Sequence, residues 1–127
     1  MPSRKIQDCD TRLQEVWHKA SELYHITYPE APMVFLTCTY RTPQEQLELY
    51  ALGRTKKGSI VTNIKSGGKH NSLPAKAFDI AFKTKDGKLD WSDIHFKNFA
   101  AIVKKLNTKV EWGGDWKNFK DLPHFQI

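Results

Sequence analysis

Apolar residues recur at spacings of three and four over residues 8–24, which is the period of an amphipathic helix. The residues on this period are Leu13, Val16, Trp17, Ala20, Leu23 and Tyr24. Pro29 and Pro32 then break the helical pattern. The apolar segment over residues 33–40 is short and rich in strand-forming residues, so it predicts a mostly buried strand.

Capping residues predict a second helix directly after this strand. Thr42 stands at an N-cap position, with Pro43 first and Glu45 third in the helix, which is the pattern of a capping box. The helix is expected to end at Gly53, a residue type common at helix C-termini. Over residues 54–77 the apolar period disappears and glycines appear, which predicts a long loop. Such a loop inside a small domain is usually functional or disordered.

The rest of the chain mixes strands with one more helix. We expect a strand over residues 78–82, a turn over 85–88, a helix over 91–106 and short strands over 110–112 and 124–127. The helical period is carried by Ile94, Phe99, Ile102, Val103 and Leu106, with Asp90 or Ser92 as the cap. Because this order has no regular βαβ alternation, the expected fold is α+β, in one domain over residues 1–127.

Composition narrows the possible partners. The 127 residues suit one domain, and the longest apolar run is far shorter than the roughly 20 residues that cross a membrane, so we expect no membrane insertion. The formal net charge is +6, which attracts nucleic acid, anionic lipid or anionic wall polymer alike. The lysines are scattered and form no nucleic-acid motif, so we expect no nucleic-acid partner. Cys9 and Cys38 are expected to be buried thiols, because two cysteines are too few for a disulfide scaffold.

Two of the five histidines lie where regular structure ends, and each has a carboxylate nearby in sequence. His70 is in the long loop and is followed by Asp79 at the start of a predicted strand, whereas Asp121 shortly precedes His124. Two imidazoles and one carboxylate leave the fourth position of a tetrahedral zinc site open for water, and a second carboxylate could act as general base. Spacing alone leaves open that His70 is an ordinary loop residue and that Asp79 caps a turn.

A Gly-Gly-Asp sequence between two tryptophans is the remaining candidate feature. Trp112 and Trp116 are either core aromatics or residues that line a cleft, and the two glycines would let the backbone approach a site. Asp115 could orient a metal-binding histidine.

Four ordered segments of the chain resemble one family. They comprise residues 40–55, 69–79, 112–116 and 121–125. These segments are similar to the M15 zinc peptidases, which include VanX-type and VanY-type D-Ala-D-Ala peptidases, and are most similar to the phage L-alanyl-D-glutamate endolysins. The resemblance runs from about Phe35 to Phe125. It implies a Hedgehog/DD-peptidase-like fold, with a central antiparallel sheet flanked by helices.

The resemblance also assigns roles to individual residues. It implies that zinc is bound by His70, Asp79 and His124, that Asp121 is the general base, and that Arg41 holds or polarises the substrate. Many members have a serine where this chain has Gly68, and Ser66 or Ser72 could replace that hydroxyl. The candidates for substrate binding are Ser72, Trp112 and Asp115.

The expected function is therefore zinc-dependent hydrolysis of the L-alanyl-D-glutamate bond in the stem peptide of bacterial peptidoglycan. The alternatives are a D-Ala-D-Ala carboxypeptidase or dipeptidase on the same fold, or a non-catalytic basic module that binds the wall. The N-terminus lacks the apolar segment and cleavage site of a secretory signal. We therefore expect the protein to be made in the host cytoplasm and to reach the cell wall after holin-type release, where it acts in lysis. We also expect a monomer.

Overall fold

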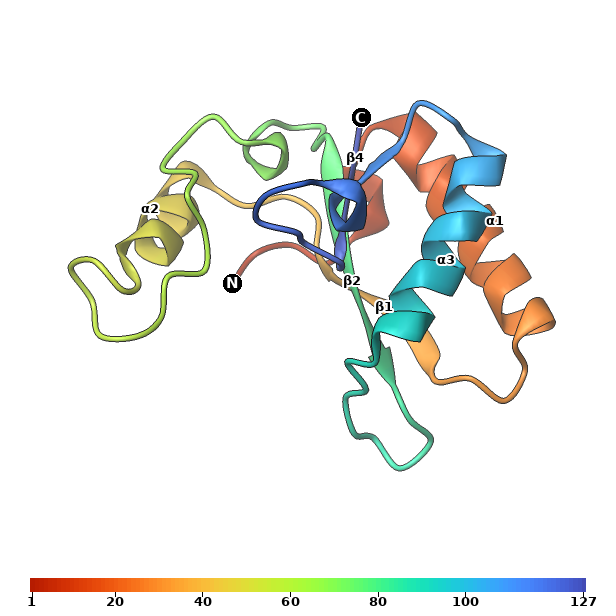
Figure 1. The fold of residues 1–127 in the computed structure, drawn as a ribbon. Helices are drawn as coiled ribbons and strands as arrows, with labels where there is room; N and C mark the ends of the chain where they lie inside the picture. The colour runs from red at the N-terminus through yellow and green to blue at the C-terminus, as the bar shows by residue number, and fades with distance from the viewer.

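Four short strands form one antiparallel sheet in the order β1-β2-β4-β3 (Figure 1). Their bounds are Met33–Cys38 for β1, Ala77–Lys83 for β2, Glu111–Trp112 for β3 and His124–Gln126 for β4. The coordinates are a computed structural model that describes residues 1–127. The sheet and its flanking helices confirm the α+β class with a central antiparallel sheet.

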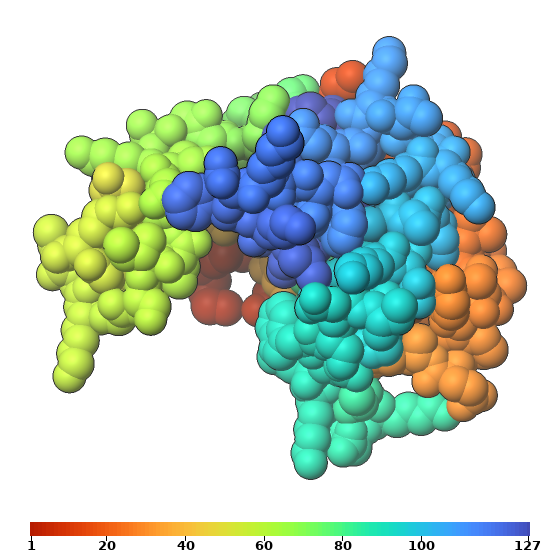
Figure 2. Space-filling model, viewed as in Figure 1, coloured from red at the N-terminus to blue at the C-terminus, as the bar shows by residue number.

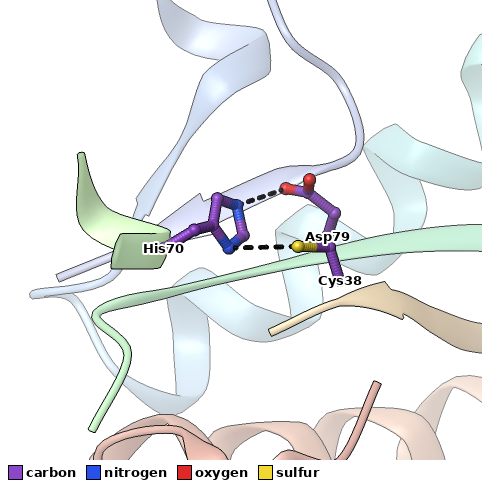
Figure 3. Close-up of side chains that lie close together, drawn as sticks. All are labelled: Cys38, His70 and Asp79. Carbon is purple, nitrogen blue, oxygen red and sulfur yellow. Dashed lines mark hydrogen bonds and ion pairs between the residues drawn. The ribbon is translucent and has the colours of Figure 1, made fainter. Parts of the chain in front are cut away.

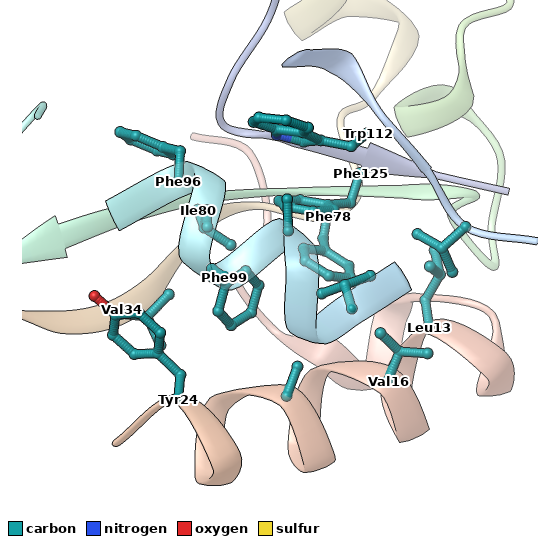
Figure 4. Close-up of a cluster of buried hydrophobic side chains, with 14 of the residues drawn as sticks. Leu13, Val16, Tyr24, Val34, Phe78, Ile80, Phe96, Phe99, Trp112 and Phe125 are labelled. Atoms are coloured by element: carbon teal, nitrogen blue, oxygen red, sulfur yellow. The ribbon is translucent and has the colours of Figure 1, made fainter. Parts of the chain in front are cut away.

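Helices α1 (Thr11–Thr27) and α3 (Asp93–Leu106) pack on one face of the sheet and against each other (Figures 1 and 4). Successive residues of a strand point to opposite faces, so β2 turns alternate residues toward these helices. Phe78, Ile80 and Phe82 are buried in the core on this side. Asp79 lies between two of them in sequence and points to the opposite face. The main apolar cluster therefore lies on one side of β2, and Asp79 stands on the other.

The helical periods are confirmed with a few corrections. Leu23 is exposed at the outer side of α1. In α3, Ile94 and Leu106 are exposed, and Phe96 is buried although it was not among the expected core residues. Phe96 instead packs edge-on against Phe82 of the sheet, with ring centroids 4.8 Å apart.

Helix α2 (Pro43–Ala51) lies away from the core, beyond the other side of the sheet (Figure 1). The predicted capping box is confirmed: the Thr42 hydroxyl accepts from the Glu45 N–H at 3.1 Å, and the Glu45 carboxylate accepts from the Thr42 N–H at 2.8 Å. Its one buried side chain is polar, Gln46, whereas Leu47 is exposed. Polar contacts therefore matter more than apolar burial in holding α2.

The long loop after α2 is also confirmed. It contains only a short 3-10 helix, η2 (Lys69–Asn71), before β2 begins. At its start Gly53 has φ +77°, and a Cβ there would lie 2.7 Å from the backbone nitrogen of Ile60, so this turn requires glycine. No helix of the protein combines the length and the apolar character that crossing a membrane requires.

Candidate metal centre

Sheet register brings Asp79 and His124 together from strands that are far apart in sequence. Asp79 of β2 pairs directly with His124 of β4, so the two side chains emerge side by side on the face away from the core. His70 approaches the same point from η2. The Asp79 Oδ1 atom lies 3.2 Å from His70 Nε2 and 3.0 Å from His124 Nδ1. One carboxylate oxygen thus meets two imidazole nitrogens, and we call these three residues the candidate metal centre.

The outer nitrogen of each imidazole is held by an oxygen that can only accept a hydrogen bond. His70 Nδ1 donates to the Thr39 carbonyl oxygen at 2.7 Å, and His124 Nε2 donates to Gln126 Oε1 at 2.7 Å. In a neutral imidazole only one nitrogen carries hydrogen, so in the neutral form of both rings the inner nitrogens present lone pairs. Lone pairs that converge on a carboxylate oxygen repel one another unless a cation lies between them.

This donor set fits a metal ion. Two nitrogens and a carboxylate oxygen are ligands that zinc accepts, each at about 2.0–2.1 Å. Two such ligands on a tetrahedral ion lie about 3.3 Å apart, close to the observed separations of 3.0 and 3.2 Å. Outer hydrogen bonds that fix the rings are also typical of metal-binding histidines.

Cys38 is a further potential ligand that sequence reasoning missed. Possible ligand atoms of Cys38, His70 and Asp79 all lie within 4.8 Å of one another (Figure 3). The sulfur, however, lies 3.6 Å from His70 Nδ1, the nitrogen that already donates to Thr39, whereas Asp79 faces Nε2. The residues that would hold an ion at Nε2 are therefore His70, Asp79 and His124. The sequence carries no local signal for Cys38, because a β-bulge between Leu36 and Cys38 places it opposite Asp79.

Burial and hydrogen bonding shift the pKa values of His70 and Asp79 in opposite directions. Burial alone would lower the pKa of His70, but hydrogen bonds with Asp79 and Cys38 outweigh it and raise the pKa to about 10. Burial would raise the pKa of Asp79, yet the hydrogen bonds from His124 and His70 hold it well below its usual range. The centre therefore attracts positive charge strongly, whether a proton or a metal cation.

Asp121 lies beside the centre with a different electrostatic character. Burial, with help from the negative charge of Asp79, raises the pKa of Asp121, although His124, His70 and Arg41 partly oppose this. Its backbone is fixed, since its N–H donates to the Gly113 carbonyl at 3.0 Å and its carbonyl accepts from the His124 N–H at 3.1 Å. A carboxylate with a raised pKa at a fixed position is suited to accept and return a proton.

Gly113 lies in close contact with the backbone of Asp121. A Cβ at position 113 would lie 2.2 Å from the Asp121 carbonyl oxygen, which is backbone and cannot easily move aside. The expectation that the two glycines permit a close backbone approach therefore applies to Gly113 and Asp121.

Arg41 reaches the site from the end of β1 and has no carboxylate partner. Its guanidinium donates to Gln46 Oε1 at 2.9 Å and to Cys38 Sγ at 3.4 Å. Gln46 also accepts from Asn71 Nδ2 at 3.2 Å and donates to the Ile64 carbonyl at 2.6 Å. The buried polar residue of α2 thus connects Arg41, η2 and the long loop, and it is a second contributor that sequence reasoning missed.

These groups line one cavity of about 970 Å³. Arg41, Asp121 and the candidate metal centre all contribute to it. Ile60, Val61 and Ile64 of the long loop form one wall, and Trp116 and Phe119 belong to the opposite wall. Figure 2 shows the hollow between these two segments, residues near 60 and residues near 118. The cavity is large enough and open enough for a peptide to reach the centre.

The three predicted substrate-binding residues are not among those that line this cavity, so the structure does not bring them together with the centre. Ser72 is exposed and its hydroxyl donates to the Pro74 carbonyl at 3.0 Å. Trp112 is buried in the core, where its indole donates to the Leu122 carbonyl at 2.7 Å. Asp115 is exposed and pairs with Lys104 at 2.6 Å, so it does not orient a histidine.

The cavity is lined instead by the other tryptophan of that segment. The ring of Trp116 lies 5.3 Å from the ring of His124, centroid to centroid. Both tryptophans flank the same glycines, and only the packing of Trp112 on the core leaves Trp116 for the cavity.

Comparison with known proteins shows what this chain is similar to. Residues 66–127 match the M15 peptidase family described as D-alanyl-D-alanine carboxypeptidase, and this segment holds Asp121 and the candidate metal centre. A relative, the peptidoglycan L-alanyl-D-glutamate endopeptidase CwlK of Bacillus subtilis strain 168, is 39% identical over 102 residues. That alignment covers 74% of this chain, and the chain spans 60% of the length of the relative.

A solved structure shows the same fold. The crystal structure of the Serratia marcescens L-Ala D-Glu endopeptidase ChiX matches with a TM-score of 0.72 at 22% sequence identity, covering 100% of this chain and 88% of ChiX. The sequence match therefore relates residues 66–127 of this chain to the M15 peptidase family.

Proposed function

We propose that this protein is a zinc-dependent endopeptidase that hydrolyses the L-alanyl-D-glutamate bond of the peptidoglycan stem peptide. The observation that carries the proposal is the convergence of His70 Nε2 and His124 Nδ1 on Asp79 Oδ1, next to Asp121 in an open cavity. The choice of bond is supported by the 39% identity to a relative that carries this activity in its name.

The chain's own residues divide the work as follows. His70, Asp79 and His124 would hold zinc, which when bound supplies a Lewis acid and makes water a stronger nucleophile. Asp121 accepts the proton of the attacking water and later returns it to the leaving amine of D-glutamate. Its raised pKa suits both halves of this transfer, because a weaker acid holds the proton long enough to deliver it.

Arg41 contributes fixed positive charge to substrate binding. Its guanidinium is held by Gln46 and Cys38, which leaves the charge without a carboxylate partner. Lys69 and Lys120 also line the cavity and form no ion pair. The stem peptide is rich in carboxylates, so these cations complement it.

We further propose that the enzyme acts as a monomer in lysis of the bacterial wall, in the manner of phage endolysins after holin-type release. The net charge of +6 supports retention on an anionic wall. The family description of D-alanyl-D-alanine carboxypeptidase favours a second candidate, removal of terminal D-alanine by the same centre.

Digestion of purified peptidoglycan tests the proposal. The protein is incubated with wall alone, with a chelator, and with a chelator followed by zinc, and mass spectrometry identifies the new termini. We expect new D-glutamate amino termini that disappear with the chelator and return with zinc. Release of terminal D-alanine would instead establish the carboxypeptidase, and zinc binding without cleavage would leave a wall-binding module. The His124→Ala variant serves as the control that lacks one proposed ligand.

A further inference from the structure

Two residues outside the proposed reaction lie behind His124 at the edge of the sheet. Glu111 of β3 pairs with Gln126 of β4 across the sheet. Gln126 follows His124 by two positions on the same strand, so both side chains point to the same face. The side chains of Glu111, Gln126 and His124 thus form a row that leads from solvent to the candidate metal centre.

The hydrogen bonds along this row can run in only one direction. A carboxylate only accepts, so Glu111 Oε2 requires Gln126 to present its NH₂ group, which lies 3.3 Å away. The amide oxygen of Gln126 then faces His124 Nε2 at 2.7 Å, and this nitrogen must carry the hydrogen. His124 Nδ1 is left with its lone pair, directed at Asp79 Oδ1 at 3.0 Å. The carboxylate of Glu111 therefore determines which nitrogen of His124 carries the hydrogen.

Glu111 also holds the cavity wall next to the same histidine. Its Oε2 atom accepts from Trp116 Nε1 at 2.5 Å, and the Trp116 ring packs on the His124 ring. One carboxylate thus fixes both the ring that lines the cavity and the amide that orients His124.

We propose that Glu111 and Gln126 are positioning residues that hold His124 in the Nε2–H tautomer, with Nδ1 free to bind metal. This inference rests on the proposed metal centre and extends it to two residues that are not among its ligands. Outer partners of this kind typically change metal affinity by about 10- to 100-fold when they are removed.

Zinc affinity and the tautomer of His124 test the proposal without measuring turnover. Affinity is measured by competition with a chromophoric chelator, and a long-range proton–nitrogen NMR spectrum of the zinc-loaded protein identifies the bound nitrogen. Gln126→Met keeps the side-chain length but cannot accept, so we expect an affinity loss of about 10- to 100-fold and loss of the single Nδ1-bound form. Gln126→Glu can still accept from Nε2–H, so it is expected to keep the Nδ1-bound form of His124, although its carboxylate loses the hydrogen bond to Glu111.

The exposed end of the row gives an independent variant if Gln126→Met does not fold. In Glu111→Gln the new amide can both donate and accept, so it no longer fixes the orientation of the Gln126 amide. Gln126 itself is still present, so we expect a smaller loss of zinc affinity than in Gln126→Met. Glu22→Gln makes the same charge change at an exposed position of α1 and is expected to leave zinc affinity unchanged.

Two failures are distinguishable. Wild-type affinity together with an Nδ1-bound His124 in both Gln126→Met and Glu111→Gln would overturn the positioning role while leaving the metal centre intact. If His124→Ala binds zinc as tightly as the wild type, the metal centre itself is wrong.

Discussion

Each histidine of the candidate metal centre offers one particular nitrogen, and a neighbouring oxygen determines which. For His70 the oxygen is the backbone carbonyl of Thr39, which no side-chain substitution removes. For His124 it is the side-chain amide of Gln126, which can be substituted. A side-chain substitution can therefore remove the hydrogen-bond partner of His124 but not that of His70.

Asp121→Asn separates proton transfer from metal binding. The amide keeps the size of the side chain but cannot accept a proton, so we expect turnover to fall by roughly 10²- to 10⁴-fold with full zinc content. Turnover on a defined muropeptide and metal analysis of the same sample measure the two effects. Asp86→Asn, in the exposed turn before α3, is the matched control and is expected to keep normal turnover. Near-normal turnover in Asp121→Asn would show that another group is the base.

At the level of elements, the start of α1 is tied to the strand that carries Asp79. Asp10 caps α1 by accepting from the Arg12 N–H at 2.9 Å, and it pairs with Lys76, which directly precedes β2, at 2.8 Å. Hydrogen bonds from Arg12 and Lys76 hold the pKa of Asp10 well below its usual range. This carboxylate therefore fastens the helix layer to the sheet beneath the candidate metal centre.

The stabilisation by Asp10 depends on pH in a defined direction. Because the pKa is lower in the folded state, the contribution is complete above the unfolded value of about 4 and is lost as the pH falls below it. We expect Asp10→Ala to lower the free energy of unfolding by about 1 kcal/mol at neutral pH, the usual cost of a lost N-cap. Urea denaturation at neutral pH and near pH 3 should show this difference shrinking in acid. Glu30→Ala, at an exposed position without a partner, should show neither effect, and a difference independent of pH would contradict the assignment.

At the level of the whole molecule, positive charge accompanies an open cavity. The net charge is +6, and three of the cations, Arg41, Lys69 and Lys120, line the cavity itself. Attraction between exposed charges weakens as salt shortens the Debye length from about 10 Å at 0.1 M to about 3 Å at 1 M.

Salt should therefore slow digestion of intact wall more than hydrolysis of a short soluble stem peptide. The wall is a polyanion that attracts the whole protein, whereas a short peptide interacts mainly with the cavity. Rates on both substrates at low and high sodium chloride measure the difference. Equal salt dependence would mean that the net charge has no part in retention on the wall.

Local features of the sequence were sufficient for the elements. The helical period of α1, the capping box of α2 and the turn after β2 each depend on residues a few positions apart, and all three form as expected. The ordered segments around Arg41, His70 and His124 likewise carry the resemblance to M15 peptidases, because a family pattern is a property of the linear chain.

The assembly of the site depended on contacts between distant residues. Asp79 and His124 are 45 positions apart, and only the register of β2 with β4 brings their side chains together. Ser72 and Asp115 are predicted from linear patterns to bind substrate, but the fold leaves both exposed and outside the lining of the cavity.

Trp112 and Trp116 show most clearly that local sequence does not determine which side chains line the cavity, because nothing in their neighbourhoods distinguishes them. The sequence alone therefore determined the helices and the strands, since short-range hydrogen bonding and apolar periodicity encode them. Only the tertiary structure decided which tryptophan faces the cavity, where Cys38 lies and which nitrogen of each histidine is free. Strand register, a bulge and long-range hydrogen bonds set these features, and none of them is a property of a local segment.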